Sequence, residues 1–272
     1  MRVIPAPPPG IYRNVPEADY HAWDACSQSR INLMSRSPAT CQWRMRHPEK
    51  KSYQDFGTGV HCRVLQPDVF SRIYLRGPNV KSKAAKLWKD FVAAHPDNIC
   101  LKPSEADLYE TAYESVMAHP RARRLIEEAG DAEISVRWDE DTWLPDHYPL
   151  MMKGRADRIV GAVMVDFKTT ADASADSFTR SVFSYGYHRQ AALYLRGFAR
   201  HGIECGEYVF ICVEKEPPYL VGVYPLKSEV ISLGWQESEP LIAQYARCLT
   251  TGQWPGYQSQ EIGLPKWATE AA

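Results

Sequence analysis

The sequence lacks the patterns that mark several large classes of protein. No apolar run approaches the roughly 20 residues that a helix needs to cross a bilayer, so we expect no membrane partner. The proline-rich stretch from Met1 to Gly10 has no apolar core like that of a signal peptide, which favours a cytoplasmic location. The seven cysteines form no Cys-x-x-Cys pair, which argues for reduced thiols and against zinc or iron–sulfur binding.

The chain also has little overall charge, but its charges are unevenly distributed. The net charge is −1. Residues 1–103 contain 16 Lys or Arg and 8 Asp or Glu, whereas residues 104–146 contain 4 and 12. A polyanionic partner would therefore meet the first third of the chain, unless the two segments neutralise each other by contact.

Two apolar runs joined by Gly161-Ala162 predict a β-hairpin with an acidic residue on each strand. The runs cover residues 150–160 and 162–168. Asp157 and Asp166 can lie side by side in such a hairpin, and Lys168 leaves its strand on the same face as Asp166. Two carboxylates and an ammonium suit a divalent cation bound by oxygen atoms. Asp-x-Lys alone is common, however, and a solvated ion pair is the simpler interpretation of it.

A second candidate is His61, within the stretch Phe56-Gly57-Thr58-Gly59-Val60-His61. Phe56, Val60 and Val64 recur every four residues, which predicts a helix with a buried stripe beside His61. Two glycines in a helical pattern indicate close approach by another group. A lone histidine beside an apolar stripe is more often a core residue than a ligand.

The rest of the pattern predicts alternating helices and strands. We expect strands at 133–138, with Ile134, Val136 and Trp138 on one face, and at 208–213 and 219–224. We expect helices at 38–47, 81–95, 103–129 (divided at Pro120 and capped by Ser104), 187–201 and 228–249, and a turn from Ile31 to Met34 capped by Ser29. This order is typical of an α/β fold with a mixed central sheet flanked by helices. We assign residues 1–130 to an N-terminal helical extension, 131–250 to the core and 251–272 to an irregular tail, within one integrated domain.

Two further groups are weaker candidates for contacts with phosphate. A basic, aromatic stretch contains Trp43, Arg44, Arg46, Lys50 and Lys51, and it is either a nucleic-acid contact or a solvated helix face. Thr169 and Thr170 follow Lys168 and could donate to phosphate, although β-branched residues at the end of a strand need no such explanation.

The hairpin motif resembles the signature of the PD-(D/E)XK nuclease superfamily. Asp157…Asp166-Phe167-Lys168 matches that signature, and Gly-Thr-Gly-Val-His61 is similar to the metal-binding histidine motif of its RecB-like branch. Gln190-x-x-x-Tyr194 matches the glutamine–tyrosine motif of the same branch, and Glu133 lies where many members have an acidic residue. Upstream, Gly10-Ile11-Tyr12-Arg13-Asn14, Asp19-Tyr20-His21 and Ser37-Pro38-Ala39 resemble the RecE-type exonucleases (exodeoxyribonuclease VIII and prophage relatives). The proline usually found before the first aspartate is Ala156 here, at a position that supplies no ligand.

The resemblance implies a bacterial or phage DNA exonuclease that digests duplex ends, 5′ to 3′, and leaves single-stranded overhangs for recombination. It implies Mg²⁺, with Mn²⁺ acceptable, bound by His61, Asp157, Asp166 and the carbonyl of Phe167, with Glu133 as a ligand or a neighbour of one. Lys168 would orient or deprotonate water, and Gln190 and Tyr194 would position DNA or brace the lysine. A ring-shaped homo-oligomer and a single-strand annealing protein of RecT type are implied as partners.

Two alternatives remain open from the sequence. A structure-specific endonuclease of the same fold would also cut closed or branched DNA. A non-catalytic DNA-binding or assembly protein that keeps the fold should have lost site residues. All six residues of the motifs are present here: Asp157, Asp166, Lys168, His61, Gln190 and Tyr194.

Overall fold

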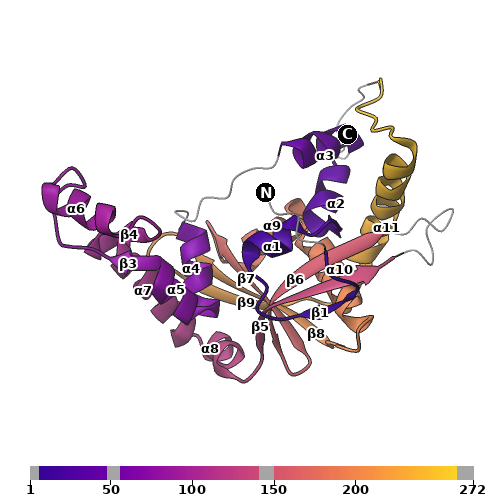
Figure 1. The fold of residues 1–272 in the computed structure, drawn as a ribbon. Coiled ribbons are helices and arrows are strands. Elements are labelled where there is room, and N and C mark those ends of the chain that lie inside the picture. Colours follow the sequence, from indigo (N-terminus) through magenta and orange to yellow (C-terminus); the bar gives the residue numbers. More distant parts are fainter. Residues whose placement is uncertain (1–5, 48–55, 141–149, 262–272) are drawn as a thin grey trace.

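A computed structural model describes residues 6–47, 56–140 and 150–261 (Figure 1). Its strands are β1 (Gly10–Tyr12), β2 (Cys26–Ser27), β3 (Tyr74–Arg76), β4 (Ile99–Leu101), β5 (Asp131–Asp139), β6 (Met151–Val160), β7 (Val163–Thr170), β8 (Glu207–Glu214) and β9 (Val221–Pro225). Its helices are α1 (Glu17–Ala22), α2 (Gln28–Met34), α3 (Pro38–Arg46), α4 (Phe56–Leu65), α5 (Pro67–Ile73), α6 (Lys86–Ala94), α7 (Pro103–Ala118), α8 (Pro120–Glu127), α9 (Ala175–Ser184), α10 (Tyr187–Ala199) and α11 (Ser228–Thr251). Among the described residues, no helix combines the length and the hydropathy of a membrane span.

The main sheet is mixed, as the sequence predicts. Its strands follow the order β1-β5-β6-β7-β8-β9, and β2 pairs with β6. β7 and β8 are parallel over their whole length, while β5, β6 and β7 are successively antiparallel. The predicted hairpin turn is confirmed, since Val160 pairs with Val163 and Gly161 has a φ of 54° that favours glycine.

The strands β6 and β7 part near the middle of the sheet. β6 pairs with β5 from Ile159 to Met151, but with β7 its pairing ends at Arg158 and Val165. Beyond that point β7 stays with β8, and β2 pairs with β6 at Met152 and Lys153. The next residue on each strand is Asp157 or Asp166, so the hairpin register brings the two acids to the point where the strands separate.

Helices cover both faces of the sheet (Figure 1). On one face α2, α9, α10 and α11 pack on strand residues such as Met164 and Phe210. On the other, α4, α5, α7 and α8 pack on residues such as Val165 and Phe167. Because successive side chains of β7 point to opposite faces, Asp166 and Phe167 belong to different halves of the core.

Most predicted elements are confirmed, with errors at their ends. Ile134, Val136 and Trp138 of β5 are buried, and α7 and α8 are divided before Pro120. Ser104 is not the N-cap of α7, because Pro103 takes the first helical position and the Glu105 carboxylate accepts from the N–H of Lys102.

Three other boundaries are wrong. Ser29 lies inside α2, whose N-cap is Ser27. The helix expected over residues 81–95 begins only at Lys86. The strand expected from residue 219 begins at Val221. The prediction also missed α1, α5 and the short strands β1 to β4.

Candidate active site

Three potential metal ligands from distant parts of the chain meet where β6 and β7 part. His61 of α4 lies with its Nε2 3.2 Å from Oδ2 of Asp157 and its Nδ1 3.7 Å from Oε1 of Glu133. One ligand atom from each of the three residues lies within 4.8 Å of the others. We call His61, Glu133 and Asp157 the imidazole cluster. His61 is therefore more than a core histidine, because it links acids of β5 and β6 from the helix that packs over them.

The Asp157 carboxylate also replaces a backbone acceptor. Its Oδ2 accepts a hydrogen bond of 2.7 Å from the N–H of Phe167, just beyond the last paired residues of β6 and β7. The Phe167 ring is buried under α4 and contacts the His61 ring edge-on, with centroids 6.0 Å apart. The peptide of Phe167 is thus fixed beside Asp157, which is where the sequence places a carbonyl ligand.

Glu133 has an unusual backbone for its residue type. Its φ is 50°, in the left-handed region that a non-glycine residue enters only at a cost. The flanking pairs Ala132–Arg158 and Ile134–Ala156 place it opposite Asp157. Its second oxygen lies 3.8 Å from the guanidinium of Arg155, which also donates to Ser135 Oγ and to the carbonyl of Val15. These contacts hold the strained backbone of Glu133 in place, and its carboxylate points toward His61.

A second group lies on the other face of β7. Asp166 is only 1% exposed and accepts at Oδ1 from Gln190 Nε2 (2.5 Å) and Tyr208 Oη (3.2 Å). Its Oδ2 forms an ion pair with Lys168, whose Nζ also lies 4.8 Å from the ring centroid of Tyr187. We call Asp166, Lys168, Gln190 and Tyr208 the ammonium cluster. Asp166 is not among the three residues of the imidazole cluster, so its role as a metal ligand stays a prediction.

Burial and the charges of the two clusters shift the pKa values of their residues. Burial and repulsion from Asp157 raise the pKa of Glu133 to about 7, and burial raises that of Asp166 to about 6. Burial would lower the pKa of His61, but Asp157 and Glu133 outweigh it and raise that pKa to about 9. Burial would also lower the pKa of Lys168, but Asp166 and Asp157 outweigh it and raise the pKa above its usual value. Lys168 is therefore a protonated ammonium beside Asp166.

Tyr194 packs against β6 beside the imidazole cluster. A Cβ on Gly154 would lie 2.9 Å from its ring, so the glycine admits the tyrosine against β6. The Tyr194 ring is half-buried, and its hydroxyl bonds to the backbone of Arg155. The predicted close approach occurs at Gly59, one of the two α4 glycines, since a Cβ there would lie 2.2 Å from the Tyr109 ring.

The imidazole cluster opens into a groove of ≈ 1380 Å³. Its walls come from α1 and α2 on one side and from α4 and α5 on the other, and Gln190 and Tyr194 contribute to its lining. Arginines from four different helices also line it: Arg30 of α2, Arg44 of α3, Arg72 of α5 and Arg189 of α10. The groove therefore contains an acidic site with arginines around it, of which Arg189 is also paired with Glu237 at 2.7 Å.

The predicted phosphate contacts are dispersed. Arg44 lines the groove, while Arg46 is exposed on α3. Thr169 is half-buried, and the Thr170 hydroxyl donates to the carbonyl of Asp172 at the end of β7. Lys50 and Lys51 lie outside the described residues.

The donor set fits a hard divalent cation. Two carboxylates and one imidazole are ligands that Mg²⁺ and Mn²⁺ accept. An octahedral ion with bonds of about 2.1 Å separates its ligand atoms by roughly 3 to 4.2 Å. The observed limit of 4.8 Å requires only a small closing movement of the side chains. His61, Glu133 and Asp157 would hold such an ion, and Asp166 lies on the adjoining strand.

The comparison with known families agrees with this geometry. The family model described as a PDDEXK-like domain of unknown function (DUF3799) matches residues 27–263. The chain belongs to this family. A solved structure from Eubacterium rectale named "Putative exonuclease" is similar to this PDDEXK-like chain with a TM-score of 0.57 and 10% identity, over 91% of this chain and 93% of that one. That similarity establishes a shared fold.

A second solved structure is more distant. The phage-related exonuclease from Haemophilus somnus 129PT gives a TM-score of 0.35 and 13% identity, over 71% of this chain and 94% of that one. No curated protein matches the chain. The family match confirms the PD-(D/E)XK superfamily, and the RecE-type assignment stays a prediction.

The prediction missed the residues that support the site. Tyr208 reaches Asp166 from β8, and Arg155 reaches Glu133 from β6. Lys153 is buried and donates to the carbonyls of Tyr20, His21 and Trp23, which ties the C-terminal end of α1 to β6. Lys153 and Arg155 alternate with small residues on β6, and this pattern could have indicated that both have structural partners. It could not have identified those partners, because most of them are backbone carbonyls.

Proposed function

We propose that the chain is a metal-dependent exodeoxyribonuclease that hydrolyses phosphodiester bonds at the ends of duplex DNA, 5′ to 3′, and generates overhangs for recombination. The observation that supports it best is the meeting of the imidazole cluster, which lines the groove, with the Asp166–Lys168 pair on the adjoining strand. Acids that bind a cation and an ammonium that faces phosphate are what this hydrolysis needs.

The cation, which we propose to be Mg²⁺ with Mn²⁺ as a substitute, would be held by His61, Glu133 and Asp157 and would activate water and offset charge on the phosphate. Lys168 would donate hydrogen bonds to the attacking water or to a phosphate oxygen. Its raised pKa favours this orienting role over that of a general base. Gln190 holds Asp166 through a hydrogen bond and so sets the position of the lysine.

The arginines of the groove support a polyanionic substrate. Arg44, Arg72 and Arg189 approach the groove from α3, α5 and α10. Arginine binds phosphate with a planar fork of donors, and such contacts provide most of the affinity for a nucleic-acid backbone. The ring-shaped oligomer and the annealing partner are further proposals that depend on this function.

The test is digestion of an end-labelled linear duplex and of the same DNA as a closed circle, with Mg²⁺ or with EDTA. We expect digestion of the linear DNA only and only with Mg²⁺. Lys168→Met serves as the matched inactive variant. Cutting of the circle would instead support the endonuclease alternative, and binding without cleavage of either DNA would support the non-catalytic one.

A further inference from the structure

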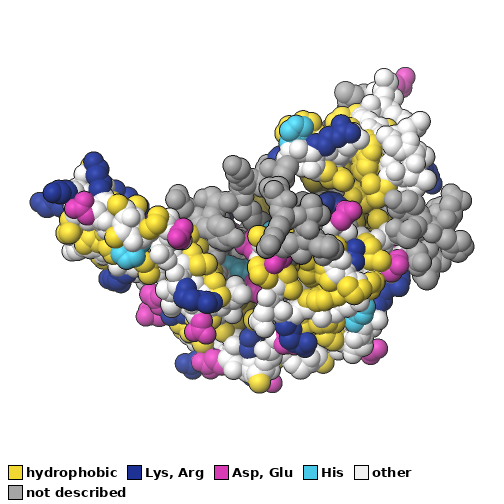
Figure 2. Space-filling model, viewed as in Figure 1, with side chains coloured by type: hydrophobic (Ala, Val, Ile, Leu, Met, Phe, Trp, Pro, Cys, Tyr) yellow, Lys and Arg dark blue, Asp and Glu magenta, His cyan; other side chains and the backbone are white. Residues whose placement is uncertain are grey.

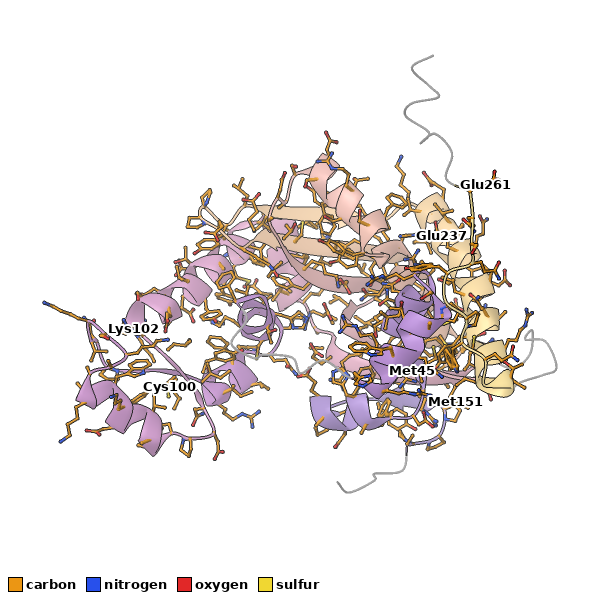
Figure 3. The ribbon with its side chains drawn as sticks, turned by 90° about the horizontal axis from the view of Figure 1, so that it is seen from above. Met45, Cys100, Lys102, Met151, Glu237 and Glu261 are labelled. Atoms are coloured by element: carbon orange, nitrogen blue, oxygen red, sulfur yellow. The ribbon has the colours of Figure 1, made fainter. Side chains whose placement is uncertain are left out.

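A small lobe projects from the side of the molecule and touches the site described above only at its first residue, Tyr74. It comprises residues 74–102, which contain β3, α6 and β4, and we call it the lysine lobe. Its two strands form a separate parallel sheet. In Figure 1 the lobe extends beyond α4 and α5, and Figure 3 shows Cys100 and Lys102 on a part of the chain well apart from Met45 and Glu237.

The lysine lobe is folded around its own aromatic centre. Trp88 is 5% exposed and lies near Phe91, with ring centroids 6.2 Å apart. A Cβ on Gly77 would lie 2.8 Å from the Trp88 ring, so the strand end packs directly on it. Ion pairs of 2.7 Å join Arg76 to Asp107 and Lys83 to Glu105, and both attach the lobe to α7. Its outer surface is therefore presented in a fixed position.

That outer surface is cationic. The lobe contains six Lys or Arg and two Asp, so its net charge is +4 in a chain whose net charge is −1. Lys81, Lys86 and Lys89 are exposed, and within the described part of the chain no acid forms an ion pair with any of them. Figure 2 shows Lys and Arg side chains gathered at the outer end of the lobe.

Helix stability does not account for this arrangement. The first turn of α6 contains no acid and begins with Lys86, although helix N-termini are stabilised by acids and destabilised by cations. Leu87 and Val92 are also exposed, but single exposed apolar side chains are normal on protein surfaces. The feature that distinguishes the tip of the lobe is therefore its positive charge.

The lobe also continues the groove. Arg72, Ile73 and Tyr74 are among the residues that line the groove, and Tyr74 is the first residue of β3, so the groove reaches the base of the lobe. A polyanion that leaves the active site along α5 would therefore meet the lobe next. Duplex DNA carries one charge per 1.7 Å or so when both strands are counted, and α6 is about 14 Å long. The helix therefore spans a length of duplex that carries on the order of eight phosphate charges.

We propose that the lysine lobe binds the phosphate backbone of duplex DNA ahead of the active site, through Lys81, Lys86 and Lys89. This inference rests on the proposed function, because it makes the duplex that enters the groove the ligand of the lobe. The lobe holds the undigested duplex and contributes affinity without taking part in hydrolysis. Its contacts are to phosphates and carry no sequence preference.

The test compares two variants that each lose three positive charges. The lobe variant is Lys81→Gln/Lys86→Gln/Lys89→Gln. The control is Arg124→Gln/Lys227→Gln/Arg247→Gln, whose residues are exposed on or beside α8 and α11 and do not line the groove. Binding to a fluorescent 30-base-pair duplex is followed by anisotropy in EDTA at several KCl concentrations, together with the melting temperature of each protein.

We expect the lobe variant to bind roughly tenfold more weakly at moderate salt. The slope of the logarithm of its affinity against the logarithm of salt concentration should be shallower by about 0.9 for each phosphate that it no longer binds. The control should bind within twofold of the unmodified protein, and neither melting temperature should change. In Mg²⁺, the KM of the lobe variant for linear duplex should rise while kcat stays within twofold.

Three outcomes would overturn the proposal. The lobe variant could bind as tightly as the unmodified protein, or the control could weaken binding equally, which would indicate a general charge effect. A changed sedimentation mass with unchanged DNA binding would show that the lobe contacts a second copy of the chain instead. Because binding is measured without metal, a protein that binds duplex through the lobe but cleaves nothing would refute the proposed exonuclease while leaving the lobe assignment intact.

Discussion

The two clusters of the candidate site meet where β6 and β7 part, and they are built differently. The imidazole cluster joins three elements that are far apart in sequence, and two acids there share one imidazole. The ammonium cluster balances one acid with one lysine and adds two neutral donors, Gln190 and Tyr208. An excess of acid suits a cation, whereas a balanced pair suits the positioning of a charged side chain. We propose from this comparison that the imidazole cluster binds the metal and that the ammonium cluster presents a positive charge to the substrate.

The strongest test of this division is at Asp157, which belongs to the metal side and also to the sheet. Both Asp157→Ala and Asp157→Asn should reduce duplex cleavage by roughly 10³-fold, since each removes a charged ligand. The asparagine retains an acceptor for the Phe167 N–H and the alanine does not. The alanine variant should therefore be less stable than the asparagine variant by about 1–2 kcal/mol in urea denaturation. Equal stabilities would show that this hydrogen bond contributes nothing to folding.

Lys168→Met should separate the role of the ammonium cluster from that of the imidazole cluster. We expect cleavage to fall by about 10² to 10⁴-fold, because the ammonium near the reacting phosphate is removed. The affinity for Mn²⁺, measured by calorimetry, should stay within a few-fold of the unmodified value. A large decrease in Mn²⁺ affinity would mean that the lysine organises the metal ligands, and the proposed division of roles between the two clusters would be wrong.

His61→Ala should produce the opposite pattern. Loss of one ligand should weaken Mn²⁺ binding by about 10 to 100-fold, the range seen when metal-site residues are altered. Cleavage should then recover in part at high Mn²⁺ concentration, which Lys168→Met should not do. Failure of added metal to restore any activity would indicate that the imidazole acts on the substrate.

The smallest expected effect is a pH dependence of metal binding. Glu133, with a pKa of about 7, must lose its proton to bind a cation, and so must His61, with a pKa of about 9. Protons therefore compete with the metal, and affinity should rise from pH 6 to pH 8 by up to about tenfold per unit for each proton released. In His61→Ala this rise should be shallower. An affinity that is constant over this range would contradict the proton linkage.

The residues of the site that could be predicted from local sequence patterns are those that lie close together along the chain. Asp157 and Asp166 belong to one hairpin, so apolar runs and a glycine turn sufficed to bring them together. Glu133 and His61 came from resemblance to a family, because nothing local connects β5 or α4 to that hairpin. Tyr208 was missed since the parallel pairing of β8 with β7 follows a long crossover whose register leaves no local signal.

The N-terminal part shows the same limit. Residues 10–12 and 26–27 form strands only because β5 and β6 offer unpaired edges to them. Their own sequences contain no alternation long enough to predict a strand. The buried Lys153 likewise depends on three carbonyls at the end of α1, and a sequence does not show which carbonyls lack partners.

The hydrogen bond between Asp157 and the Phe167 amide bears on how the proposed activity would be lost over evolution. A lineage not selected for cleavage can replace Lys168 without breaking a main-chain hydrogen bond, since that side chain contacts only other side chains, and its loss leaves the buried Asp166 to Gln190 and Tyr208. Replacing Asp157 leaves a main-chain amide without its acceptor. Degenerate members should therefore lose the lysine early and keep the aspartate, or an asparagine, long after catalysis has ended.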